Sequence, residues 1–165
     1  MSKSRNVFLT TAGFHVPDVN QNGDENNRIV ITLTNPTNRT LKAHVRVESY
    51  SEGEPSFIFL PAEYTLTRTI LEDFGKVEVQ PNTITRLEAE LPALDRSTLR
   101  VVTKGDYKTE DGNPASGKLE ISSVVGYGNT LAVNLINIPE SLAPGLHSAD
   151  TSTLFRYEDY IVTDE

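Results

Sequence analysis

The chain has 165 residues, a formal net charge of −8 and no cysteine. A nucleic-acid binder needs an excess of basic residues to displace counterions from phosphates, and attraction to an anionic membrane needs the same excess, so the charge argues against both partners. At this length one domain buries enough surface to be stable without disulfides or structural metals.

Residues 1–16 are expected to form a first strand or an extended N-terminal arm. The apolar run Val7–Leu9 is shorter than the roughly 7–15 apolar residues of a secretory signal. No stretch approaches the roughly 20 apolar residues of a membrane-spanning helix. The sequence therefore predicts no leader and no membrane insertion. It leaves the location open: a cell surface, a spore surface and a virion are all compatible with it.

The polar stretch after Pro17 resembles the first half of a calcium-binding loop. Oxygen-bearing side chains alternate there as in the pattern D-x-[DN]-x-[DN]-G, and the candidate Ca²⁺ ligands are Asp18, Asn20, Asn22 and Asp24. The position of the closing bidentate glutamate is Ile29, and no helices are expected beside the loop. Two interpretations stay open: a calcium site, or a solvated loop that turns at Asn22-Gly23.

The segment 28–49 predicts two alternating strands joined by a turn at 35–38. Apolar side chains recur at every second position, and a period of two places them on one face of a sheet. The inward positions are Ile29, Ile31, Leu33, Leu41, Ala43, Val45 and Val47, and the outward positions of the second strand are Lys42, His44, Arg46 and Glu48. Charge should therefore be tolerated at His44 and not at Val45.

Short alternating or apolar segments continue toward the C-terminus. They cover 56–60, 64–70, 76–80, 85–91, 99–103, 118–125, 131–135 and a last strand within 152–162. Arg68 interrupts the apolar side of its segment, which either argues against a strand there or places the strand at an edge. We expect a long turn-rich connection at 105–117, a tight reversal at 126–129 and a single helical turn at 140–143.

Roughly nine short strands with turn signals every 8–12 residues predict an all-β fold, an antiparallel β-sandwich of immunoglobulin-like or jelly-roll type. The lack of segments with helical periodicity argues against a parallel α/β architecture. We expect a single domain, with a sandwich core at 17–139 and extended terminal segments at 1–16 and 140–165.

Two stretches of sequence carry a resemblance to a known group of domains. The segments RIVITLTNPTNRTLKAHVRVES and GKVEVQPNTITRLEAEL, residues 28–49 and 75–91, resemble immunoglobulin-like sandwich domains of bacterial surface proteins. The chain departs from antibody domains, because it lacks the cysteines and the tryptophan that pin their core. The resemblance implies a sandwich fold, and folds of this class host unrelated functions.

No residue cluster in the sequence predicts catalysis. His15, His44 and His147 lie on separate segments without metal-ligand spacing, and there is neither a G-x-S-x-G motif nor a cysteine nucleophile. We therefore expect that the protein is not an enzyme. His44, between Lys42 and Arg46, is expected on a solvated face or on a docking patch for an acidic partner.

These observations favour a structural or assembly subunit of a filament, coat, appendage or virion. Such a subunit associates with itself or with other structural proteins through sheet edges and terminal arms. The alternative is a ligand-binding β-sandwich module for carbohydrate or Ca²⁺, and no other cofactor is expected. Its candidate aromatic contacts are scattered, at Tyr50, Tyr64, Tyr107 and Tyr127.

Overall fold

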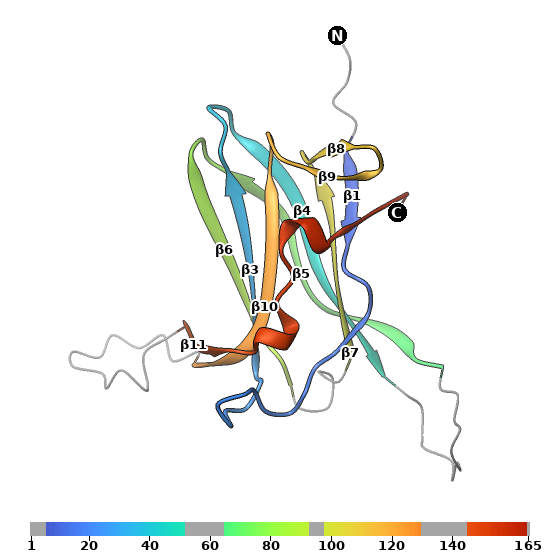
Figure 1. Cartoon of the computed structure of the whole chain (residues 1–165), viewed down its shortest axis with the longest axis vertical. Coiled ribbons are helices and arrows are strands. Elements are labelled where there is room, and N and C mark those ends of the chain that lie inside the picture. The colour runs from blue at the N-terminus through green and yellow to red at the C-terminus, as the bar shows by residue number, and fades with distance from the viewer. Residues whose placement is uncertain (1–5, 52–64, 93–97, 130–144, 165) are drawn as a thin grey trace, which may run out of the picture.

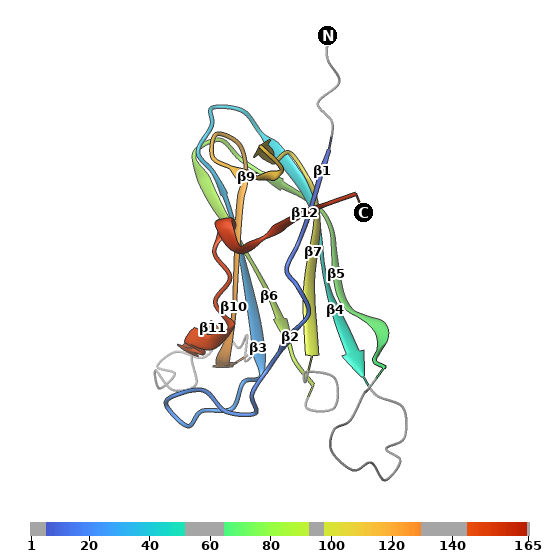
Figure 2. The same ribbon diagram turned by 45° about the vertical axis from the view of Figure 1, so that its right-hand side comes forward.

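The computed structural model describes residues 6–51, 65–92, 98–129 and 145–164. These residues form two antiparallel sheets that face each other, as Figures 1 and 2 show. The predicted all-β sandwich is therefore confirmed. Three expected elements, 56–60, 131–135 and the helical turn at 140–143, lie outside the described residues.

Sheet I has the strand order β12-β1-β7-β4-β5, with β2 also paired to β7. Its strands are β1 (Val7–Thr10), β2 (Phe14–His15), β4 (Leu41–Ser51), β5 (Thr67–Val79), β7 (Thr98–Gly105) and β12 (Ile161–Thr163). Sheet II has the order β11-β10-β3-β6, formed by β3 (Arg28–Asn35), β6 (Thr83–Glu90), β10 (Glu120–Asn129) and β11 (Gly145–Ala149). A small hairpin of β8 (Lys108–Glu110) and β9 (Asn113–Ala115) closes one end.

The core lies between the sheets and contains the side chains that the alternation places inward. Ile29, Ile31 and Leu33 of β3 are fully buried against Val45 and Val47 of β4. The other predicted inward positions are buried as well: Leu99, Val101, Leu119, Ile121 and Val125. His44 is exposed and Val45 is fully buried, as the period of two predicts for neighbouring residues of a strand.

Strand β5 corrects the expectation of two separate strands at 64–70 and 76–80. It runs without a break over Thr67–Val79, and its register against β4 shifts twice. Leu71 and Phe74 have no directly opposite residue in β4, and both pack against the core. Ile70 is 51% exposed. Ile70 lies opposite Glu48 of β4 on the outer face, so the expectation that Ile70 faces inward is wrong. The two bulges break the period of two, which lets both Leu71 and Phe74 pack inward. The edge position predicted from Arg68 is confirmed, because β5 ends sheet I.

The expected reversal at 126–129 is wrong. β10 continues through these residues to Asn129 and pairs with β11. A Cβ atom at Gly126 or Gly128 would collide with the backbone of β11, so the glycines allow a close approach of two strands rather than a turn. The connection 105–117 does turn, at Asp111-Gly112, where both residues have positive φ (52° and 78°) and join β8 to β9.

Both terminal segments pack into the sandwich where the structure describes them. β1 pairs with β7 on one side and with β12 on the other. The C-terminal segment is not one long strand: two 3-10 turns, η2 (Thr151–Thr153) and η3 (Tyr157–Asp159), precede the three-residue β12. This segment crosses from sheet II to sheet I (Figure 2). The Tyr160 hydroxyl ties it to sheet II by donating to Ser123 Oγ of β10 at 2.8 Å.

Asp150 fastens the C-terminal segment to the loop before β3. Its carboxylate accepts from Asn26 Nδ2 (2.7 Å) and from the N–H and hydroxyl of Ser152 (2.9 and 2.6 Å). Burial alone would raise the pKa of Asp150, but these hydrogen bonds outweigh it and lower the pKa below its usual 3.8. The stabilisation is therefore present above about pH 4 and is lost as the pH falls through the lowered pKa.

We expect Asp150→Asn to lower the free energy of unfolding by about 2 kcal/mol at neutral pH, because charge-assisted hydrogen bonds are lost. Urea unfolding of both proteins at pH 7 and at pH 3 measures this. The difference should shrink at acid pH, where wild-type Asp150 approaches protonation. Exposed Asp164→Asn is the control and should change stability by less than about 0.5 kcal/mol. A difference for Asp150→Asn that is the same at both pH values contradicts the assignment.

Candidate functional site: the basic outer face of sheet I

The outer face of sheet I gathers side chains from four strands. Residues directly opposite in a ladder share a face, so the registers of β1, β7, β4 and β5 define the set. We call this surface the basic face; it consists of Phe8, Thr10, Lys42, His44, Arg46, Glu48, Tyr50, Arg68, Ile70, Asp73, Lys76, Glu78, Arg100, Val102 and Lys104. Figure 1 shows these strands side by side in sheet I.

The basic face has the opposite charge to the rest of the chain. Its basic side chains are Lys42, Arg46, Arg68, Lys76, Arg100 and Lys104, and its acidic ones are Glu48, Asp73 and Glu78. It thus holds six of the 15 basic residues and three of the 23 acidic ones in a chain of net charge −8. A local excess of positive charge on an acidic protein attracts anionic groups to this face.

A fully buried carboxylate organises one half of the basic face. Glu48 has no exposed surface, although its strand position points away from the core. Three guanidinium groups cover it: Arg46 at 3.2 Å, Arg68 at 3.4 Å and Arg100 at 3.3 Å. The hydroxyl of Tyr50 also donates to its Oε1 at 3.1 Å. Because one carboxylate cannot neutralise three guanidinium groups, positive charge remains at the surface of this cluster.

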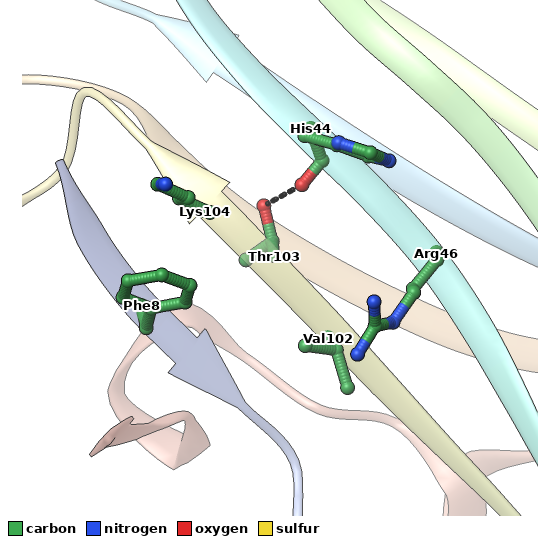
Figure 3. Close-up of a pocket in the computed structure, with 6 residues that line it drawn as sticks. All are labelled: Phe8, His44, Arg46, Val102, Thr103 and Lys104. Atoms are coloured by element: carbon green, nitrogen blue, oxygen red, sulfur yellow. Dashed lines mark hydrogen bonds between the residues drawn. The ribbon is translucent and has the colours of Figure 1, made fainter. Parts of the chain in front are cut away.

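The other half of the face contains a shallow pocket of about 230 Å³. Its lining residues are Phe8, His44, Arg46, Val102, Thr103 and Lys104, drawn in Figure 3. Lys104 Nζ lies 4.9 Å from the centre of the Phe8 ring, a cation–π contact that holds the ammonium over the pocket wall. Arg46 and Val102 lie side by side in the figure, so the pocket offers cationic donors next to apolar surface.

The donors of Arg46 are only partly used within the part of the chain that is described. One Nη atom contacts Glu48, whereas its buried Nε has no hydrogen-bond partner there. A carboxylate binds a guanidinium best in a bidentate manner, through two of its N–H groups.

His44 is held at the rim of the pocket by Asp73 of the neighbouring strand. Its Nε2 lies 2.6 Å from Asp73 Oδ1, and the N–H of Gly75 donates to the same oxygen at 2.8 Å. The Gly75 hydrogen bond and, after it, the hydrogen bond with His44 lower the pKa of Asp73 below its usual value. Asp73 is therefore ionised at neutral pH and orients the imidazole.

The loop with the four predicted calcium ligands lies at the other end of the sandwich from the β8–β9 hairpin (Figure 2). Asn20 Oδ1 accepts from the backbone N–H groups of Asn22 (2.9 Å) and Asp24 (3.1 Å), and the side-chain amides of Asn20 and Asn22 donate to Ser148 Oγ. Gly23, at φ 80°, completes the turn. This geometry favours the interpretation as an asparagine-based turn; Ca²⁺ binding by Asp18, Asn20, Asn22 and Asp24 stays a prediction.

The structure does not bring the other candidate residues together. His15 lies on β2, and His147 on β11 lies beside Tyr127, with the ring centres 6.2 Å apart. Tyr107 is buried, with its hydroxyl 2.7 Å from Thr103, and burial raises its pKa above 10. It belongs to the core and not to a carbohydrate platform. Tyr64 lies outside the described residues.

The described ranges contain no group of three or more His, Cys, Asp or Glu side chains arranged to hold a metal ion. Within the same ranges no helix has the length and apolar character needed to cross a membrane. The strongest constellation in the structure is therefore the basic face. Sequence reasoning found only its β4 part, Lys42, His44 and Arg46, because these alternate within one strand.

Comparisons with known proteins add little to this picture. No family model and no curated protein matches the chain. Among solved structures, the crystal structure of Thermotoga maritima 1070 is similar over 76% of this chain and 82% of that chain, with 11% sequence identity and a TM-score of 0.32. A likeness this weak supports no argument about fold or function.

Proposed function

We propose that the protein is a non-enzymatic structural or assembly subunit that binds an acidic protein surface with the basic face. It would associate with copies of itself or with other structural proteins, as a component of a filament, coat, appendage or virion. The observation that carries this proposal is the concentration of positive charge on the outer face of sheet I in an acidic chain. Complementary charge steers association and fixes which surfaces meet.

The edge of sheet I supports the same role. β5 is 13 residues long and ends the sheet, and no described strand pairs with its outer side. An uncovered edge presents backbone N–H and C=O groups to which another chain can add a strand. The exposed Ile70 adds apolar surface next to this edge. The face and the edge together form one continuous surface for a neighbouring subunit.

A location at a cell or spore surface, or in a virion, belongs to this proposal. It follows from the assembly role and from the resemblance of residues 28–49 and 75–91 to immunoglobulin-like domains of bacterial surface proteins. A fold of this class serves many functions, so the argument rests on the basic face.

A ligand-binding module is the second candidate, and one observation favours it. The pocket between Phe8 and Arg46 combines apolar walls with cationic donors and has room for a small ligand. A glycan array that includes neutral and acidic sugars distinguishes the two candidates. A signal that disappears in Arg46→Gln would support the binding module.

The assembly role is tested by sedimentation velocity of the untagged protein over a wide concentration range. We expect species larger than the monomer, and fewer of them as the salt concentration rises from about 50 mM to about 500 mM, because salt screens charge pairs.

The variant Lys76→Glu/Lys104→Glu should weaken association at least tenfold. The control Arg39→Glu/Arg86→Glu changes the net charge equally at exposed positions outside the basic face, and it should associate like the wild type. Monomers under all conditions would refute self-association.

A further inference from the structure

The partner of the basic face can be inferred from the charges on the same chain. We infer that it is a second copy, whose loop 18–26 docks onto the basic face so that copies join head to tail. This inference rests on the proposed assembly role and names the two surfaces that meet. It also gives a role to the acidic loop that the sequence presents as a candidate calcium site.

The loop has the charge that the basic face requires. Residues 6–27 contain no lysine or arginine, and the acidic residues among them are Asp18, Asp24 and Glu25. Asp18 is exposed and Asp24 is half-buried. The basic face has an excess of three positive charges, so the two surfaces are complementary in sign. Opposite charges at an interface select this pairing over the contact of two like surfaces.

The loop also offers apolar surface where the pocket needs it. Val19 is 52% exposed and lies next to Asp18 in the chain. Val102 lies beside Arg46, and Phe8 lines the pocket from β1 (Figure 3). A docked loop would place a carboxylate on Arg46 and an aliphatic side chain against Phe8 and Val102. These two contacts match the charged and the apolar parts of the pocket. Exposed apolar surface rimmed by charge is typical of an interaction site.

The loop is already ordered in the isolated chain. Asn20 bridges its backbone and donates to Ser148 Oγ at 2.8 Å, and Asn26 donates to Asp150 at 2.7 Å. The backbone N–H of Asn20 donates to the carbonyl of Asp24 at 2.8 Å, which closes the loop. A preorganised loop loses little conformational entropy when it docks, so more of its contact energy remains as affinity.

The two surfaces belong to different parts of the molecule, so one copy can use both at once. The loop projects from the lower end of the sandwich in Figures 1 and 2, whereas the basic face is the outer side of sheet I. Contacts between two different patches are heterologous, and they generate rings or open filaments rather than closed dimers. This outcome agrees with the proposed role in a filament, coat or appendage.

A charge-swap experiment tests the pairing. The face variant is Lys76→Glu/Lys104→Glu, and the loop variant is Asp18→Lys/Asp24→Lys. Each variant alone brings like charges together at the interface, so its self-association should fall at least tenfold. An equimolar mixture should assemble again, because each altered surface then meets a complementary one. Sedimentation velocity and negative-stain microscopy measure assembly, and far-ultraviolet circular dichroism verifies that each variant is folded.

The outcomes separate the inference from the function on which it rests. If the wild type assembles and the loop variant assembles equally well, the loop is not the partner, and the assembly role stands. Failure of the mixture to recover assembly, with both variants folded, also overturns the inference. If the wild type remains monomeric at every concentration and salt, the self-assembly role fails as well. The Arg39→Glu/Arg86→Glu control should assemble throughout.

Discussion

Val45→Asp is expected to unfold the protein, whereas His44→Asp is expected to leave the fold intact. Val45 is fully buried between the sheets, and His44 next to it in β4 is exposed on the basic face. Replacing Val45 removes about 1.5–3 kcal/mol of apolar burial and places a carboxyl group in the core without a partner. The combined cost reaches about 5 kcal/mol or more, which matches the whole stability of a marginal domain.

The matched variant His44→Asp carries a smaller and different cost. The new carboxylate would face Asp73, but both lie in solvent and Lys76 and Lys104 flank them in the ladder. A loss of less than about 1 kcal/mol is expected for this exposed site. Circular dichroism and thermal unfolding of the two variants check the pair. Equal melting temperatures would show that the faces of β4 are assigned wrongly.

This pair of residues also shows how much of the fold the sequence predicts. In β3, β4, β6, β7 and the first half of β10, the alternation of apolar and polar residues places the inward side chains correctly, because one dry and one wet face impose a period of two. The prediction fails in β5, where Ile70 lies opposite Glu48 on the outer face and two bulges break the alternation, so that both Leu71 and Phe74 pack inward. A bulge depends on the partner strand, so a single segment does not reveal it.

The predictions of a last strand within 152–162 and of a reversal at 126–129 fail for a related reason. Asp150 caps the 3-10 turn η2 and also accepts a hydrogen bond from Asn26, more than 120 residues earlier. Gly126 and Gly128 carry the signature of a turn, yet they serve the close approach of β11. In both cases the local sequence is compatible with two conformations, and contacts with distant residues decide between them.

The candidate site was only partly predictable. Lys42, His44 and Arg46 are visible as alternating residues, but their neighbours Arg68 and Lys104 come from strands whose register the sequence does not give. The buried state of Glu48 could not be anticipated at all. An outward glutamate is normally solvated. It is buried here because long arginine side chains from three strands lie over it.

Glu48→Ala is expected to be among the most destabilising single changes on the outer surface of the protein, although it removes no core side chain. Without the carboxylate, the guanidinium groups of Arg46, Arg68 and Arg100 would repel one another across adjacent strands. Losing the hydrogen bonds to a charged, buried group costs about 2–3 kcal/mol, and the remaining arginines stay partly exposed to solvent. Part of this cost should be recovered at about 1 M salt, which screens the repulsion among the partly exposed arginines.

The control is Glu78→Ala on the same face. Glu78 pairs with Lys42 at 3.3 Å, but both side chains are about half exposed, so its removal should cost less than about 1 kcal/mol. Urea unfolding of both variants at low and high salt measures the difference. Similar losses for Glu48→Ala and Glu78→Ala, without a salt effect, would mean that the arginine cluster is as solvated as an ordinary surface pair. The positive charge of the basic face would then be spread over independent side chains rather than organised around Glu48.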